Sequence, residues 1–265
     1  MTSSIVARIK QKRIAQLVSL GKRLDERGLT DYREAQVEVG VIEKAEGSAR
    51  TRLGKTEVLV GIKIEIGEPF SDVPDKGVLT VNAELTPSAS PTFEPGPPRE
   101  DSIELARIVD RGIRESEAID LEKLCIESGK KVFVVFVDVY VLNYDGNLID
   151  ASALAALAAL LNTKVFNYEV KEGEVQIKPG YKSLPIHNYP IAVTFAKIND
   201  KLVVDPELEE EQVMEARLTM TFEKDEKICA LQKGGEGYFK IPQILEAAEI
   251  ARKKAAELRK LVVKK

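Results

Sequence analysis

Residues 131–161 read KVFVVFVDVYVLNYDGNLIDASALAALAALL, and this stretch decides the fold. Its first part, 131–147, is a long apolar run rich in Val and Phe, which predicts a buried strand. The part that follows, 149–161, is apolar on every side of a helix. A 13-residue helix of this kind is too short to span a membrane, so the segment predicts a helix buried in the core.

The segments on either side of this unit indicate a duplicated α+β pattern. Helical spacing predicts an amphipathic helix over 5–20, with apolar positions that include Ile5, Ile9 and Ile14. Alternating residues over 37–67 predict an antiparallel meander, and 78–85 predicts another strand. Further elements follow: a Pro- and Ser-rich loop at 86–101, a helix at 102–118, irregular strands and loops up to Pro190, a hairpin at 191–205, strands at 215–222 and 227–233, and a helix at 242–261. Strands that cluster before each helix favour mixed sheets over a doubly wound parallel sheet.

Composition excludes several classes of protein. The chain has 265 residues, of which 44% are hydrophobic and 31% charged, so a real core is expected. We expect no membrane span and no signal peptide, and we place the protein in the cytoplasm. The net charge of −4 is unlike that of a protein that coats duplex DNA, although a local basic patch could bind nucleic acid. The single histidine, His187, excludes a multi-histidine metal site.

Several segments together resemble the RNase PH family, and most closely the archaeal exosome members that lack catalytic residues. They are RLDERGLTDYRE at 23–34, LTPSASPTFEPGPPRED at 85–101, IELARIVDRGIRES at 103–116, VDVYVLNYDGNLIDASALAALAAL at 137–160 and LPIHNYPIAVTFAKI at 184–198. The resemblance implies an RNase PH-like fold of two related βαβ-type halves with mixed sheets and flanking helices. We expect an N-terminal helix and arm at 1–30, a first domain at 31–165 and a second at 166–265.

The resemblance also implies partners. A catalytic paralogue would alternate with this chain in a hetero-hexameric ring, three copies of each, under RNA-binding cap subunits. Single-stranded RNA would be shortened from its 3′ end by phosphate attack, or extended in the reverse reaction. This chain would need no cofactor of its own, since inorganic phosphate, and Mg²⁺ if a metal is used, would serve the partner.

Two departures from the family pattern predict that this chain has no catalytic residues. Active members carry an Asp that serves the transferring phosphoryl group, and the matching position here holds Arg217. An Arg neither loses its proton near neutral pH nor ligates a metal ion. Active members also bind phosphate with a hydroxyl and an Arg at a helix N-terminus, where Leu148 and Ile149 stand here, followed by the anionic Asp150.

An acidic cluster precedes Arg217, formed by Asp205, Glu207, Glu209, Glu210 and Glu211. The simplest interpretation is a helix start, with Asp205 as N-cap and Pro206 at the first helical position. Acids in a first helical turn also suit the helix dipole. Metal binding or proton transfer by this cluster stays open as an alternative, although we expect no metal site.

The candidate RNA-binding residues are Arg107, Arg111, Arg114 and Arg99. The first three lie at i, i+4 and i+7, on one face of the predicted helix, and Arg99 precedes it. Guanidinium groups hold phosphodiester oxygens without reading sequence. A solvated face paired with Glu104, Asp110 and Glu115 would explain the same pattern, and the family resemblance favours RNA for Arg107 and Arg111.

The function that we expect is therefore that of a non-catalytic, RNA-binding ring subunit that structures the active site of its paralogue. A stand-alone phosphorolytic exoribonuclease is the alternative, but it predicts an Asp at position 217 and an Arg after Gly146. A general RNA-binding scaffold outside any ring predicts basic strands with many aromatic residues, which this sequence lacks.

Overall fold

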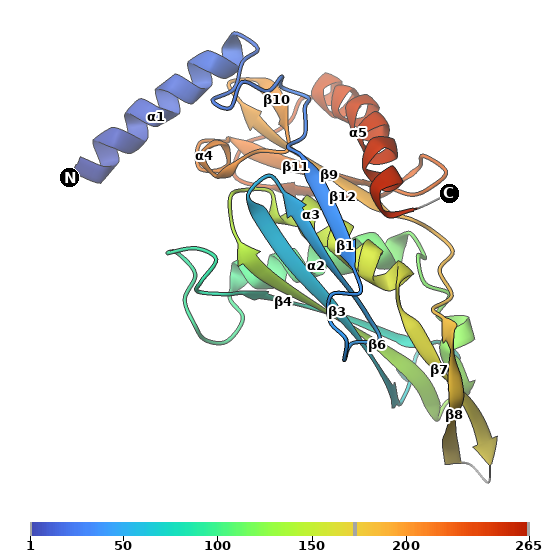
Figure 1. Cartoon of the computed structure of the whole chain (residues 1–265). Helices are drawn as coiled ribbons and strands as arrows, with labels where there is room; N and C mark the ends of the chain where they lie inside the picture. Colours follow the sequence, from blue (N-terminus) through green and yellow to red (C-terminus); the bar gives the residue numbers. More distant parts are fainter. Residues whose placement is uncertain (1, 172–173, 264–265) are drawn as a thin grey trace.

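The computed structural model describes residues 2–171 and 174–263, with side chains from Lys10 onward (Figure 1). Its larger sheet has the strand order β1-β2-β3-β6-β4, with a short strand β5 also on β6. These strands are β1 (Ala35–Val39), β2 (Gly47–Leu53), β3 (Thr56–Gly67), β4 (Val78–Leu85), β5 (Cys125–Glu127) and β6 (Lys131–Asn143). The antiparallel meander expected over 37–67 is confirmed, since β1, β2 and β3 pair antiparallel in chain order. Strand β6, later in the chain, pairs antiparallel with β3.

One parallel pair makes this larger sheet mixed. Strand β4 runs parallel to β6 because helix α2 (Glu100–Glu115) and the 3-10 turn η1 (Glu122–Leu124) carry the chain back to the start of the sheet. Helix α2 therefore lies beside β4, and the face of α2 that carries Leu105, Val109 and Ile113 is buried. The opposite face, which carries the arginines, is left toward solvent.

The smaller sheet is antiparallel throughout, in the order β10-β9-β11-β12. Its elements are β9 (Ile191–Ile198), β10 (Lys201–Val204), α4 (Leu208–Glu211), β11 (Ala216–Phe222), β12 (Ile228–Gly234) and α5 (Ile241–Val262). The expectation of a βαβ-type mixed sheet is therefore wrong for this half. Short connections join two pairs of antiparallel neighbours, β9 to β10 through the two-residue turn Asn199–Asp200 and β11 to β12 through residues 223–227. Residues 205–215, which include α4, carry the chain from β10 past β9 to β11.

Helix α3 (Leu148–Leu161) confirms the expected core helix, and it lies between the two halves of the chain (Figure 1). Ala151, Ala155 and Ala159 pack with the core of the larger sheet. Leu154 and Leu157 pack with the core of the smaller sheet, beneath α5. Both long sides of the helix meet apolar side chains, which explains why its sequence has no polar stripe.

Two peripheral elements complete the chain. Helix α1 (Thr2–Ser19) confirms the expected N-terminal helix, and Ile14 and Val18 pack on the smaller sheet. The expected apolar positions Ile5 and Ile9 lie outside the described side chains. Strands β7 (Lys164–Lys171) and β8 (Glu174–Ser183) form an antiparallel ribbon that projects from the body (Figure 1). Its register shifts between Phe166 and Asn167, in line with the irregular strands that the sequence indicated. Over the part of the chain that is described, no helix is both long and apolar enough to cross a membrane.

Candidate nucleic-acid interface and the substituted active-site region

A groove of about 690 Å³ runs along helix α2. It is bounded by Leu79, Thr80 and Val81 of the edge strand β4, by the outer face of α2, and by Gln232 of β12. The three arginines of α2 that the sequence singled out all line it, namely Arg107, Arg111 and Arg114. Helical spacing has therefore brought them together along one groove, as expected.

The four candidate arginines differ in their ion pairs. Arg114 pairs with Asp110 at 2.7 Å and also donates to the carbonyl oxygen of Leu79 at 3.0 Å. Arg99 pairs with Glu94 at 2.5 Å, away from the groove. Arg107 and Arg111 are exposed and make no ion pair with any residue that the structure describes. A salt-bridged solvent face thus accounts for Arg114 and Arg99 but leaves two arginines of the groove available.

Arg217, which the sequence predicts to replace a catalytic Asp, lies at the start of β11 and reaches helix α2. Its Nη2 donates to Glu104 Oε1 at 2.6 Å, and its side chain is 16% exposed. Glu104 lies three residues before Arg107 on helix α2. Arg217 therefore directly contacts the helix that carries the candidate RNA-binding arginines. Sequence reasoning placed Glu104 near the arginines of its own helix and missed this partner, because the two residues are 113 positions apart.

Glu211 occupies the N-terminus of helix α3, where active family members are expected to hold phosphate. Its Oε1 accepts from the backbone N–H of Asn147 at 2.9 Å, and its Oε2 accepts from the Tyr144 hydroxyl at 2.6 Å. Burial raises the pKa of Glu211, and these two hydrogen bonds offset the rise in part. A helix N-terminus favours an anion, and in this chain the anion is a carboxyl group of the protein itself.

Close packing fixes this contact. Gly146 has φ +87° and lies against the backbone of Pro206 and Glu207, so that a Cβ at this position would lie 2.5 Å from the Glu207 carbonyl carbon. Only glycine combines this left-handed conformation with so close an approach. The turn before α3 and the acidic segment are therefore held in direct contact.

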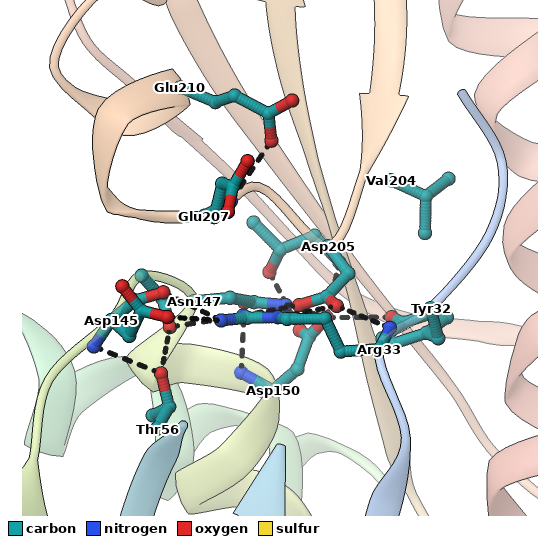
Figure 2. Close-up of polar contacts among 12 residues, drawn as sticks. Tyr32, Arg33, Thr56, Asp145, Asn147, Asp150, Val204, Asp205, Glu207 and Glu210 are labelled. Carbon is teal, nitrogen blue, oxygen red and sulfur yellow. Dashed lines mark hydrogen bonds and ion pairs between the residues drawn. The ribbon is translucent and has the colours of Figure 1, made fainter. Parts of the chain in front are cut away.

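The acidic segment is held by arginines of the N-terminal arm. Arg33 binds Asp205 through two parallel hydrogen bonds, Nε to Oδ2 at 2.9 Å and Nη2 to Oδ1 at 2.7 Å (Figure 2). Arg27 Nη1 reaches Asp205 Oδ2 at 3.0 Å, and Arg23 binds Glu210 at 2.5 Å. Burial raises the pKa of Asp205, but the hydrogen bonds and charge of Arg33 outweigh it and leave the pKa below its usual value.

The expected helix cap at Asp205 is wrong. Helix α4 begins at Leu208 with Glu207 at its N-cap, so Pro206 precedes the helix rather than opening it. The Asp205 carboxylate is fully buried and pairs with Arg27 and Arg33. Because its oxygens bind these arginines, it does not cap a helix at the surface. The sequence signal for this network was the segment 23–34, whose arginines the resemblance singled out but whose partners it did not reveal.

A second buried carboxyl group joins the two halves of the chain. Asn147 donates through Nδ2 to both Asp150 and Asp205, each at 2.8 Å (Figure 2). Asp150 also accepts from the Tyr32 hydroxyl at 2.6 Å and from the backbone N–H of Thr194 on β9 at 3.0 Å. Burial raises the pKa of Asp150 to about 6, although all of these hydrogen bonds favour its charged form.

The contacts of the acidic cluster are ion pairs and hydrogen bonds with other residues of the chain, and they hold the fold together. Within residues 2–171 and 174–263, no group of three or more His, Cys, Asp or Glu side chains is arranged to hold a metal ion. The carboxylates of Asp205 and Glu210 are each paired with an arginine guanidinium group. Carboxylates paired in this way are not free to bind a metal ion.

Two models of the RNase PH family match this chain. The model for "3′ exoribonuclease family, domain 1" matches residues 31–165, and the model for "3′ exoribonuclease family, domain 2" matches residues 188–254. The chain belongs to the RNase PH family. The expected boundary between domains at 165/166 stays a prediction, since the ribbon of β7 and β8 lies largely between the two matched ranges.

Relatives narrow the place of the chain within the RNase PH family. It is 56% identical over 262 residues to "Exosome complex component Rrp42" of Thermococcus kodakarensis, covering 98% of this chain and 96% of that protein. It is 57% identical to the protein of the same name from Pyrococcus horikoshii, with the same coverage. A chain of the solved "archaeoglobus fulgidus exosome with RNA bound to the active site" superposes with a TM-score of 0.89 at 47% identity, covering 97% of this chain and 98% of that one.

Proposed function

We propose that this chain is an exosome core subunit that binds RNA without performing the chemistry, and that it completes the site of a catalytic paralogue. Its likeness to exosome components over nearly its whole length supports the core role. One observation carries the division of labour. Arg217 stands where a catalytic Asp is expected and is paired with Glu104, next to two arginines that have no ion pair in the described structure.

The proposed RNA contacts are Arg107 and Arg111. Both are exposed and both line the groove of α2, and neither forms an ion pair with a carboxylate of the described residues. The groove is also lined by four carboxylates, those of Glu100, Glu104, Asp110 and Glu115. Because an unpaired guanidinium can donate two parallel hydrogen bonds to a phosphate, these two side chains suit the backbone of a single strand. Arg114 and Arg99 have carboxylate partners of their own, so they contribute less.

Absence of catalysis is the second part of the proposal. A phosphorolytic site needs a group that serves the transferring phosphoryl and a seat for the attacking phosphate. Here the first is replaced by Arg217, and Glu211 takes the backbone N–H of Asn147 at the second. Phosphate, and any Mg²⁺, would therefore be bound by the paralogue, in a ring with three copies of each subunit beneath cap subunits, in the cytoplasm.

The test measures phosphate-dependent decay of 5′-labelled oligo(A). We expect no nucleoside diphosphate from this chain alone, with or without Mg²⁺, and activity when the catalytic paralogue is added. Decay by the chain alone would contradict the proposal and favour a stand-alone exoribonuclease.

Charge reversal tests the RNA contacts. The pair Arg107→Glu and Arg111→Glu should weaken RNA binding by the assembled ring. The matched control is Lys44→Glu with Lys253→Glu, which makes the same change of charge at exposed sites outside the groove. Equal loss in both variants would mean that net charge, and not the groove, is responsible.

A further inference from the structure

A second cavity, of about 530 Å³, is lined by residues of β4, of β6 and of the loop 86–99 that joins β4 to α2. Its floor is formed by neighbouring residues of β4 and β6. Asn82 lies opposite Asp138, and Glu84 lies opposite Tyr140, in the parallel register of these strands. Because side chains alternate along a strand, these four share one face of the sheet.

The loop above this floor is held in place by its own contacts. Phe93 stacks on Tyr144 with ring centroids 5.3 Å apart. Thr86 donates through Oγ1 to the carbonyl oxygen of Val141 at 2.5 Å, and Glu94 pairs with Arg99 at 2.5 Å. A cavity that is already formed can bind a partner without the cost of ordering its loop.

The charges around the cavity are strongly unbalanced. Four carboxylates line it, those of Glu84, Glu94, Asp101 and Asp138, against the single cation Arg99. Glu94 forms an ion pair with Arg99. The other three carboxylates, those of Glu84, Asp101 and Asp138, have no cationic partner within the described ranges. Asp138 accepts a hydrogen bond at 3.2 Å from the neutral Asn82.

An aromatic ring lies between two of these carboxylates. Tyr140 is 37% exposed on the floor of the cavity. Partial burial raises its pKa, and the negative charges of Asp138 and Glu84 raise it further, which reflects how closely they flank the ring. An aromatic face together with carboxylates is the environment that attracts a guanidinium or ammonium group.

We propose that this cavity receives an Arg or Lys side chain from a protein partner in the ring. The cation would lie over Tyr140 and pair with Glu84 and Asp138. The same carboxylates would repel the phosphates of RNA, so this cavity and the arginine groove of α2 bind different partners. The inference rests on the proposed function, since it requires that the chain assembles with other subunits.

Charge reversal tests this docking cavity. Glu84→Lys with Asp138→Lys should weaken association with the catalytic paralogue by about tenfold or more at low salt, since like charges would then meet. The control, Glu65→Lys with Glu68→Lys, makes the same change at exposed positions on and just after β3, outside the cavity. The neutral pair Glu84→Gln with Asp138→Asn keeps the shapes and should give an intermediate loss.

The aromatic contribution is measured separately. Tyr140→Phe keeps the ring face and should assemble like wild type, whereas Tyr140→Leu should weaken association by about threefold, because only the ring face attracts a cation. A role for the hydroxyl instead of the ring face would weaken association in both variants, since both lack the hydroxyl.

The outcomes separate this inference from the proposed function. If the wild-type chain does not bind the paralogue, the ring proposal fails and the inference fails with it. If the wild type and the Glu84→Lys, Asp138→Lys variant assemble equally well, the inference alone is overturned. Unchanged assembly with tighter RNA binding by that variant would show that the cavity faces RNA, which also overturns it.

Discussion

Arg217 Nη2 and Glu104 Oε1 lie 2.6 Å apart, and this ion pair joins the start of β11 to helix α2. The contact links Arg217 to the helix that presents Arg107 and Arg111. The Nε of Arg217 is buried and has no hydrogen-bond partner among the described residues, so the guanidinium is held by this contact on one side. Through Glu104, Arg217 therefore fixes helix α2 against the smaller sheet.

Returning an acid to this position should not restore catalysis. We expect Arg217→Asp to release no nucleoside diphosphate from oligo(A) when the chain is assayed alone, because Glu211 still holds the backbone N–H of Asn147. Phosphate-dependent decay by this variant would show that the α3 N-terminus remains open to phosphate.

RNA affinity of the ring should depend on salt through two arginines. Each of Arg107→Ala and Arg111→Ala should reduce the slope of log K against log salt concentration by about 0.7, the value for one contact to a single strand. Arg114→Ala should leave the slope unchanged, since Asp110 already pairs with this side chain. Titration of labelled oligo(A) at several salt concentrations measures all three slopes, and an equal decrease for Arg114→Ala would contradict the assignment.

Breaking the buried pair of Asp205 should destabilise the chain strongly. Asp205→Asn removes the buried carboxylate that Arg33 and Arg27 share, and Arg27 keeps only Asp25 as a carboxylate partner. This change should lower the free energy of unfolding by about 3–5 kcal/mol, because the Arg33 charge loses its main partner. Glu209→Gln is the control from the same segment, because Glu209 pairs with Lys10 at the surface and should change stability by at most about 1 kcal/mol. Urea unfolding measures the free energy of unfolding of both variants. Similar losses of stability would mean that the buried pairs of Asp205 contribute no more than the surface pair of Glu209.

Removing the Tyr144 hydroxyl tests the contact that positions Glu211. Tyr144→Phe deletes the hydrogen bond of 2.6 Å and leaves one oxygen of a buried carboxyl group without its donor, which should cost about 1–3 kcal/mol. If the hydroxyl acts through Glu211, the double variant with Glu211→Gln should lose less than the sum of the single losses. Additive losses would show that the two side chains act independently.

Stability should depend on pH in opposite directions for the two buried aspartates. The folded pKa of Asp150 is raised from 3.8 to about 6, so the folded state binds its proton more tightly than the unfolded chain. Its contribution is therefore fully present at low pH and is lost as pH rises from about 4 to 6, by about 3 kcal/mol. The pKa of Asp205 is lowered, so its contribution is present above pH 3.8 and is lost as pH falls further.

Denaturant unfolding between pH 4 and pH 7.5 measures this dependence. Asp150→Asn removes the titrating group, so the fall in stability between about pH 4 and 6 should be smaller in the variant than in the wild type. Identical slopes in the two proteins would assign the pH dependence to other groups.

The sequence by itself determined the local elements. The apolar run 131–147, the helix without a polar stripe at 149–161 and the arginine spacing on α2 all follow from periodicities of two and 3.6 residues, which act between near neighbours. Family motifs added the overall fold and the meaning of Arg217, because a substitution at a motif position can be seen without coordinates.

Only the tertiary structure decided which charges meet. Arg33 with Asp205, Arg217 with Glu104 and Glu211 with the N–H of Asn147 are pairs separated by 172, 113 and 64 residues. No periodicity relates such positions, because they are brought together by the packing of α3 between the two sheets. For this reason the acidic segment had the pattern of a solvated helix start, whereas the structure buries Asp205 and Glu210 against their arginine partners.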